Sequence, residues 1–375
     1  DCIRDRVEKV VTLALSLFYG YLVLLFSIVS VIRNRSKFFQ VRRRDVSPDC
    51  LRDPALGTHH FIQLRDVKLH YVSNGDENNQ TMLFIHGFPE FWYSWRHQIR
   101  EFAKDYHVIA VDNRGYGDSD KPSGIGNYTI DKLVEDIREL LAALDKQDIV
   151  LVAHDWGGAI AWNFAAKHPS LLDRLVVLNG PHPQAFADVI QRSWKQFFSS
   201  WYMFFFNLPL LPELVLLSND LSLLADFMVS ADGHQMLTTE DIEAYKYMFS
   251  KYNSLTCPLN YYRAVMRKYP SEKPRSLQIT VPTLYNSLTC PLNYYRAVMR
   301  KYPSEKPRSL QITVPTLVIW GKRDIALVPQ LADTSRRYVN DMTLQYIENC
   351  SHWTQMDQPV IVNQYIRQYL TAKRD

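Results

Sequence analysis

Short apolar runs alternate with amphipathic stretches along most of this chain. Several of the runs are apolar throughout, as is typical of parallel strands that helices cover on both faces. Runs of this length bounded by turn residues predict β-strands. Seven such strands are predicted: Val67–Val72, Met82–Ile85, Val108–Val111, Ile149–Ala153, Leu175–Leu178, Thr316–Trp320 and Leu344–Ile347.

Helical patterns separate the predicted strands. Thr129 precedes a segment whose leucine, isoleucine and valine residues fall on one stripe, which predicts a helix with Thr129 as its N-cap. Further helices are predicted over Ala159–Lys167, before Pro169, and over Pro359–Leu370. Alternating strands and helices indicate an α/β fold with a mostly parallel sheet and helices on both faces.

The stretch from about residue 185 to residue 312 interrupts this alternation. It is rich in aromatic residues, leucine and proline, and it contains helix signals such as Thr238 three residues ahead of Asp241. We therefore expect a helical cap inserted between two strands of the core.

A perfect tandem repeat lies at the end of the predicted cap. The sequence YNSLTCPLNYYRAVMRKYPSEKPRSLQITVPTL occupies residues 252–284 and recurs without a change at 285–317. Helical solenoids need about three or more repeats with divergent ends. Two identical copies in a non-repetitive chain instead indicate a local duplication or an assembly error, with the excess chain expelled near 270–312.

The N-terminal region predicts a membrane anchor. Val10–Ile32 holds 23 residues without a charge, enough to cross a hydrocarbon core. A secretory signal is the alternative, but its apolar region is shorter, about 7–15 residues, and ends in small residues. The flank at 33–44 is more basic than the flank at 1–9, so the positive-inside rule places the C-terminal part in the cytoplasm. We expect a single-pass anchor in the endoplasmic reticulum, with membrane lipid as its partner.

The composition agrees with a globular enzyme on the C-terminal side of this anchor. The 375 residues are 47% hydrophobic and 22% charged, and the net charge is +4. Residues 1–44 carry nine Lys or Arg against three Asp or Glu, so the basic excess belongs to that end. The body lacks the basic domain that nucleic-acid binding needs, so we expect no nucleic-acid partner. Five cysteines without CxxC spacing agree with a reducing compartment.

The most specific chemical motif is Val152-Ala153-His154-Asp155-Trp156-Gly157-Gly158, directly after a predicted strand. Small residues on both sides of a central residue are typical of a nucleophile elbow, a tight turn from strand to helix. The central residue here is Asp155. An ordinary helix N-cap is the alternative role for this aspartate. His154, beside it on the strand, is expected to pack and hydrogen-bond beneath the turn.

Two later segments favour the catalytic role. Asp324 comes just past one predicted strand and His352 just past the next, so the order is nucleophile, acid and histidine, as in α/β-hydrolases. Upstream, the segment from His86 to Glu90 follows another strand, where an oxyanion-hole loop belongs. The carboxyl ends of parallel strands meet at one edge of a sheet, so we expect all four segments to converge there.

These motifs resemble the epoxide hydrolases of the α/β-hydrolase fold. The resemblance runs from about residue 50 to the C-terminus, through HGFPEFWYSW (86–95), DNRGYGDSDKP (112–122), VAHDWGG (152–158), GKRD (321–324) and SHWTQMDQP (351–359). The apolar anchor with its basic flank is similar to the membrane-anchored animal members, types three and four. The resemblance implies an eight-stranded sheet and a lipophilic epoxide as substrate.

A carboxylate nucleophile suits attack on an epoxide carbon, because the resulting ester can later be hydrolysed. We expect Asp155 to form this ester and His352, oriented by Asp324, to activate the water that cleaves it. The backbone N–H groups of Phe88 and Trp156 would hold the oxyanion. Neither a metal nor a cofactor is needed for this chemistry.

The resemblance further implies two cap tyrosines that donate hydrogen bonds to the epoxide oxygen. Ser200–Phe206 resembles the segment that bears the first, which is Tyr202. The second lies in Pro-Leu-Asn-Tyr-Tyr-Arg, which occurs in both copies of the repeat and gives Tyr262 or Tyr295. Helix growth is local and cooperative, so continuity with the preceding cap helix favours Tyr262.

Two other functions fit parts of this pattern. A haloalkane or haloacid dehalogenase shares the aspartate nucleophile but needs halide-binding donors, whereas this cap offers tyrosines. A catalytically impaired scaffold of the same fold is the second alternative, because the duplication lies next to Asp324. The expected domains are a short flank at 1–9, the anchor at 10–32, a basic linker at 33–60, the core at 61–184 and 313–375, and the cap at 185–312.

Overall fold

The computed structural model describes residues 2–268 and 310–372. Its eight strands are β1 (Thr58–Gln63), β2 (Lys68–Asn74), β3 (Thr81–Ile85), β4 (His107–Val111), β5 (Ile149–His154), β6 (Leu172–Leu178), β7 (Thr316–Gly321) and β8 (Met342–Ile347). They form one sheet in the order β1-β2-β4-β3-β5-β6-β7-β8. Strand β2 pairs antiparallel with β1 and β4, and all other neighbours are parallel.

The predicted α/β fold and all seven predicted strands are confirmed. Every residue of β3, β4 and β5 is buried, which requires cover on both faces of the sheet. The eighth strand, β1, was not predicted from the pattern. Its sequence THHFIQ is largely exposed at the sheet edge, so hydrogen bonds to β2 hold it there and no apolar run marks it.

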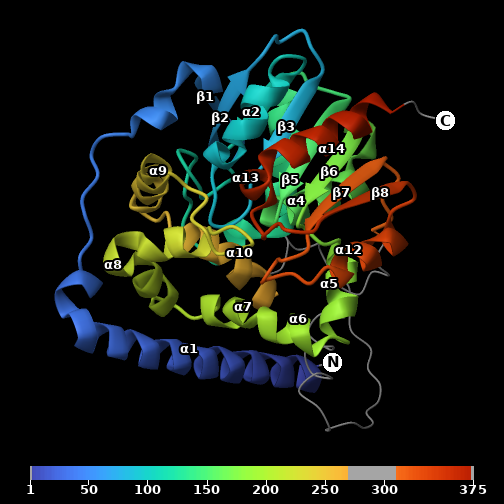
Figure 1. Ribbon diagram of the computed structural model, residues 1–375. Helices are drawn as coiled ribbons and strands as arrows, with labels where there is room; N and C mark the ends of the chain where they lie inside the picture. The colour runs from blue at the N-terminus through green and yellow to red at the C-terminus, as the bar shows by residue number, and fades with distance from the viewer. Residues whose placement is uncertain (1, 269–309, 373–375) are drawn as a thin grey trace.

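Some helices pack against the sheet, and others form a second layer beside it (Figure 1). Helices α2 and α14 pack together, as do α3 and α4. The helices of the core are α2 (Arg96–Phe102), α3 (Ile130–Ala143), α4 (Trp156–Lys167), α12 (Gln330–Ser335), α13 (Thr354–Asp357) and α14 (Pro359–Thr371).

The stretch between β6 and β7 contains the expected helices of the cap. They are α5 (Pro183–Ile190), α6 (Trp194–Ser199), α7 (Trp201–Phe206), α8 (Leu211–Phe227, bent at Ser218–Leu221), α9 (Thr239–Phe249) and α10 (Thr256–Met266). Figure 1 shows them as one layer on one side of the sheet, with α10 nearest the strands. Residues 269–309 of the repeat, which include Tyr295, lie outside the described residues.

The first residues of α9 and α3 show whether the predicted N-cap residues form capping hydrogen bonds. Thr238 and Asp241 form the expected capping box at α9, since the Asp241 N–H donates to Thr238 Oγ1 at 3.1 Å and the Thr238 N–H donates to Asp241 Oδ2 at 2.9 Å. Thr129 stands at the N-cap position of α3, but its side chain makes no capping hydrogen bond. The position was therefore predicted correctly, while the capping contact was wrong.

The N-terminal helix α1 (Cys2–Phe38) runs alongside the cap, next to α7 and α8 (Figure 1). Over Arg6–Arg33 it is long and apolar enough to cross a membrane. This helix therefore indicates a membrane anchor at the N-terminal end of the chain.

Candidate active site

Asp155 lies on a sharp turn between β5 and α4. Its backbone has φ 49° and ψ −116°, a conformation that residues other than glycine rarely adopt. A Cβ at position 157 would lie 2.2 Å from the carbonyl oxygen of Ile85, so only glycine fits where the turn brings two backbones together. Asp155 occupies the N-cap position of α4, yet its side chain makes no capping hydrogen bond. The simple capping role is therefore not what this structure shows.

The Asp155 carboxylate instead faces the loop after β3. The Phe88 N–H donates to Asp155 Oδ1 at 2.9 Å, and a Cβ at Gly87 would lie 2.5 Å from the Asp155 Cβ. Of the two expected oxyanion-hole residues, Phe88 thus contacts the carboxylate, and Trp156 follows Asp155 directly as the first residue of α4.

His352 bridges two carboxylates. It follows β8, and its Nδ1 lies 2.6 Å from Oδ2 of Asp324, which follows β7. Its Nε2 lies 3.6 Å from Asp155 Oδ2. His352 and Asp324 are 7% and 8% exposed, so bulk water screens this group of charges weakly. The structure therefore brings together the three residues that the sequence singled out.

Four donors fix the Asp324 carboxylate. The N–H groups of Ala326 and Leu327 donate to Oδ1 at 2.8 and 2.9 Å, and Asn179 Nδ2 donates to Oδ2 at 2.6 Å, beside the contact with His352. Sequence analysis missed Asn179. It directly follows β6 with φ 38°, and the Asn-Gly-Pro sequence after an apolar strand was the available signal.

The charges in this group shift one another's pKa. Burial by itself would lower the pKa of His352, but the charges of Asp324 and Asp155 outweigh burial and raise it well above its ordinary value. Burial by itself would raise the pKa of Asp155, but the hydrogen bond and charge of His352 outweigh burial and lower it. Both shifts favour an imidazolium at His352 beside an ionised Asp155.

A buried Glu90–His154 pair lies beneath the site. His154 packs and hydrogen-bonds there as expected, whereas its partner Glu90 was not predicted. His154 Nδ1 lies 2.9 Å from Glu90 Oε2, and its Nε2 lies 2.8 Å from the carbonyl oxygen of His352. Glu90 Oε2 also accepts from the Gly87 N–H at 2.6 Å. Gln355 Nε2 donates to Glu90 Oε1 at 2.6 Å. The pair thus connects the loop that contains Phe88, the end of β5 directly before Asp155, and the loop that contains His352.

Two cap tyrosines approach this group. Tyr262 on α10 packs its ring edge-to-face on Trp156 and on Phe88, with centroids 5.0 and 5.4 Å apart. Tyr202 on α7 lies 5.9 Å from Tyr262, centroid to centroid. Burial first, and then the negative charge of Asp155, raise the pKa of Tyr262 well above its ordinary value. Its phenol therefore stays protonated and can donate a hydrogen bond.

Comparison with known proteins agrees with this geometry. The family model described as alpha/beta hydrolase fold matches residues 80–359. Epoxide hydrolase 4 of Mus musculus is 38% identical over 370 residues, which cover 95% of this chain and 93% of the mouse protein. Epoxide hydrolase 3 of the same species is 38% identical over 341 residues, 88% of this chain and 83% of that protein.

Solved structures give the same result. A mutant of an epoxide hydrolase from Bacillus megaterium has a TM-score of 0.69 and 32% identity, over 84% of this chain and all of that one. Another mutant of that enzyme, solved with a diol product, has a TM-score of 0.66 and 31% identity over the same shares.

The fold, the turn at Asp155 and the family match place this chain in the α/β-hydrolase fold family. Within that family the chain belongs to the epoxide hydrolases, on its identity to the mouse proteins over most of both lengths.

Proposed function

We propose that this protein converts lipophilic epoxides to vicinal diols through a covalent ester on Asp155. The observation that carries the proposal is the carboxylate of Asp155 held on a constrained turn, with a backbone N–H on one oxygen and His352 near the other. A carboxylate held in place in this way is a nucleophile for an alkyl carbon.

In the first step a carboxylate oxygen of Asp155 attacks one epoxide carbon, and the bond between that carbon and the epoxide oxygen breaks. Tyr202 and Tyr262 donate hydrogen bonds to this oxygen as negative charge develops on it. One of the two phenols transfers its proton to the oxygen, which leaves the step as a hydroxyl, and the His352 imidazolium reprotonates the phenolate. The closeness of the two rings to each other, and of Tyr262 to Trp156, supports this assignment. Tyr295, in the second copy, stays the duplicate candidate.

In the second step His352 takes a proton from water, and the hydroxide attacks the carboxyl carbon of the ester. The N–H groups of Phe88 and Trp156 stabilise the tetrahedral oxyanion. Its collapse breaks the bond between the carboxyl carbon and the alkoxide oxygen, which takes a proton from His352 to complete the diol. The carboxylic acid left on Asp155 then returns its proton to His352, which restores the ionised Asp155. Asp324 positions the His352 ring for this transfer and stabilises the imidazolium that forms.

Ester formation also prepares His352 for the second step. The ionised Asp155 helps raise the His352 pKa. Since the ester is neutral, the first step removes that contribution, and the imidazole then gives up its proton more readily. A histidine that is protonated beside the free nucleophile thus becomes a base beside the ester.

We further propose that the helix at 10–32 attaches the protein to the endoplasmic reticulum membrane, with the catalytic part facing the cytoplasm. The basic flank at 33–44 supports that side. The division into linker, two-part core and cap, over the ranges expected from the sequence, stays a prediction.

The test is an assay of diol formation by the full-length protein on styrene oxide and on fatty-acid epoxides. Halide release from haloalkanes is the counter-assay for the dehalogenase alternative. We expect diol and no halide. Halide release without diol would replace this function with dehalogenation, and the absence of both reactions would favour a scaffold.

A further inference from the structure

Helix α1 carries no charge from residue 10 to residue 32 and is largely apolar there, but the cap covers it on only one side. A helix of this composition is stable where every face is buried. The covered residues form a stripe along one face of the helix, because they recur every three or four positions. They include Glu8, Thr12 and Ser16, which are 3%, 7% and 0% exposed. Leu15, Tyr19 and Val23 continue this stripe as partly buried residues against the core. The cap therefore accounts for one face of α1 and leaves the others without cover.

Specific contacts hold this stripe on the cap. Asn207 Nδ2 donates to Ser16 Oγ at 3.2 Å, and the Tyr19 ring stacks on Phe204 with centroids 6.1 Å apart. A Cβ at Gly20 would lie 2.3 Å from Leu208 Cδ1, so glycine permits a close approach here. The contacts extend from residue 8 to residue 23, about 22 Å of helix at 1.5 Å per residue. A helix docked over that length cannot cross a bilayer while the cap stays outside it.

The opposite face of α1 is open and apolar. Leu17, Tyr21 and Ile32 lie opposite the covered stripe at 3.6 residues per turn, and they are 56%, 60% and 78% exposed. Phe18, beside them, is 54% exposed. An apolar surface of this extent is rare on soluble proteins and marks contact with a membrane or another protein.

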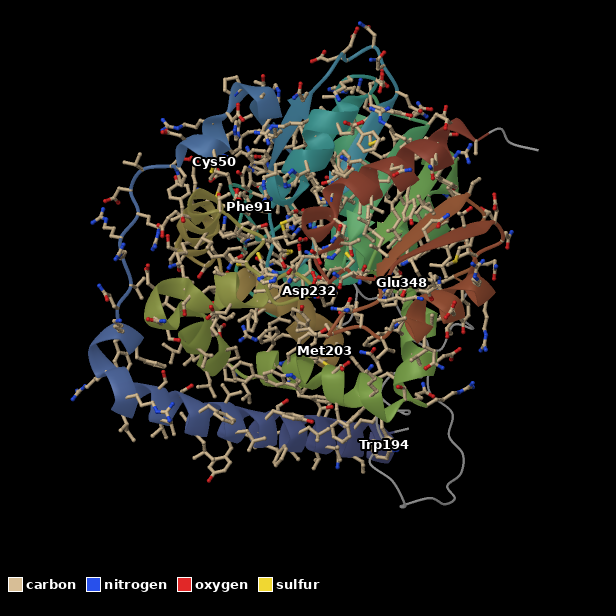
Figure 2. All side chains as sticks on the ribbon, in the orientation of Figure 1. Cys50, Phe91, Trp194, Met203, Asp232 and Glu348 are labelled. Atoms are coloured by element: carbon tan, nitrogen blue, oxygen red, sulfur yellow. The ribbon has the colours of Figure 1, made fainter. Side chains whose placement is uncertain are left out.

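The cap contributes apolar side chains of its own. Trp194 and Phe198 on α6 are 50% and 59% exposed, and Leu210 and Leu214 at the start of α8 are 73% and 61% exposed. In Figure 1 these helices form the layer next to α1, and Figure 2 shows Trp194 at the edge of the cap on the side where α1 runs. We call Leu17, Phe18, Tyr21 and Ile32, together with these four cap residues, the membrane face.

Basic residues beside this face favour lipid over a protein partner. Arg33, Arg35, Lys37, Arg42 and Arg43 are all exposed at the end of α1 or just after it. Clusters of this kind bind anionic lipid headgroups, with about 1 kcal/mol from each Lys or Arg near the surface. Arg44, in contrast, pairs with Asp220 at 2.7 Å and ties the segment to the cap.

We propose that α1 stays docked on the cap in the membrane, and that the membrane face lies in one leaflet of a lipid bilayer. Helix α1 then lies along the membrane plane and does not cross the bilayer, in place of the single-pass anchor expected from the sequence. This inference rests on the proposed function, because the cap that carries Tyr202 and Tyr262 then meets the lipid. A lipophilic epoxide dissolved in the bilayer reaches the site from the membrane side.

The first test uses the full-length protein in vesicles of phosphatidylcholine and phosphatidylserine that contain a photoactivatable acyl-chain probe. We expect labelled peptides from residues 194–214 as well as from 10–32. Val360 on α14, which is 76% exposed, supplies the control for an apolar residue away from the membrane face. Labelling confined to 10–32 would overturn the proposal in favour of a helix that spans the bilayer alone.

The second test asks whether α1 stays on the cap in the same vesicles. A Ser16→Cys, Asn207→Cys pair should cross-link with a short bifunctional thiol reagent, because the native side chains are in contact. The matched control is Phe18→Cys with Asn207→Cys, which places the first thiol on the open face. Equal cross-linking of both pairs, or none of either, contradicts a docked α1.

The third test separates membrane access from catalysis. A variant with Trp194, Phe198, Leu210 and Leu214 replaced by Gln should lose at least about tenfold in kcat/KM on a long-chain epoxide held in vesicles, since removing this much apolar contact costs more than about 1.4 kcal/mol. Its kcat/KM on styrene oxide in solution should not change. An equal loss on both substrates, or no loss on either, argues against entry from the membrane. If the unaltered protein hydrolyses neither epoxide, the proposed function fails, and lipid labelling still decides the membrane face.

Discussion

The two halves of the active site are built in different ways. At the sheet edge, Asp155, Asp324 and His352 follow β5, β7 and β8, and the parallel pairing of β5, β6, β7 and β8 brings those strand ends to one edge. In the cap, Tyr202 and Tyr262 stand on short helices that reach the site through side chains, by packing on each other and on Trp156 and Phe88. A hydrogen bond from the Tyr261 hydroxyl to the carbonyl oxygen of Arg114 also ties α10 to the core. Backbone pairing therefore positions the proposed nucleophile and base, whereas side-chain contacts position the proposed epoxide-oxygen donors.

The largest effect is expected at the sheet edge, from His352→Gln. Glutamine cannot act as the base, so turnover should fall by up to about 10⁴-fold while the ester still forms. Intact-protein and peptide mass spectrometry after epoxide addition should find one adduct, on the peptide that contains Asp155. An adduct on another residue, or unchanged diol turnover without any adduct, contradicts this mechanism.

The next effect concerns the pH dependence of ester hydrolysis. The charge of Asp324 raises the His352 pKa, so Asp324→Asn should lower that pKa. Since the base acts in its neutral form, the acid limb of the hydrolysis step should move to lower pH. The maximal rate should fall about 10³-fold because the ring loses its orienting partner.

Single-turnover decay of the ester, followed from about pH 5 to pH 9, provides the measurement. An Asp333→Asn variant, changed outside the site on α12, controls for a general loss of charge. An acid limb that stays in place, or that moves to higher pH, would be inconsistent with the assigned role of Asp324.

In the cap, Tyr262→Phe should reduce turnover about 10²-fold by removing one hydrogen-bond donor. The ring remains, so its packing on Trp156 and Phe88 is preserved. Tyr295→Phe is the matched control from the identical second copy, and its turnover should be nearly unchanged. The opposite result would show that the second copy forms this part of the cap in solution.

Deletion of one repeat copy sharpens the same comparison. Removing either 33-residue copy gives an identical chain, so deletion cannot choose between the copies. It leaves one helix to complete the cap and one strand to complete the sheet. We therefore expect the shortened protein to fold and to hydrolyse epoxides at least as well, as measured by thermal unfolding and diol formation.

The smallest effect is expected from N-glycosylation. Asn79-Gln80-Thr81 and Asn127-Tyr128-Thr129 are acceptor sequences if they meet a luminal environment, and the Asn79 side chain is exposed. A cytoplasmic catalytic part predicts no glycosidase-sensitive mass shift, and access for protease in sealed microsomes. A shift at Asn79 would place the active site in the lumen.

The sequence by itself determined the parts of this protein that depend on local pattern. Apolar runs marked seven of eight strands, and the Gly-rich turn after β5, together with the positions after β7 and β8, marked Asp155, Asp324 and His352. Each of these signals spans about ten residues or fewer, because an apolar strand and the turn that ends it are encoded together.

Tertiary structure alone decided the rest. Strand β1 exists because β2 pairs with it, and Glu90, His154 and Asn179 gain their contacts from loops far apart in the chain. The sequence also left Tyr262 and Tyr295 equivalent, since their surroundings are identical along the chain. The structure places Tyr262 beside Trp156 because the first copy continues directly from α9. Packing depends on position in space, so it can distinguish two tyrosines whose neighbours along the chain are identical.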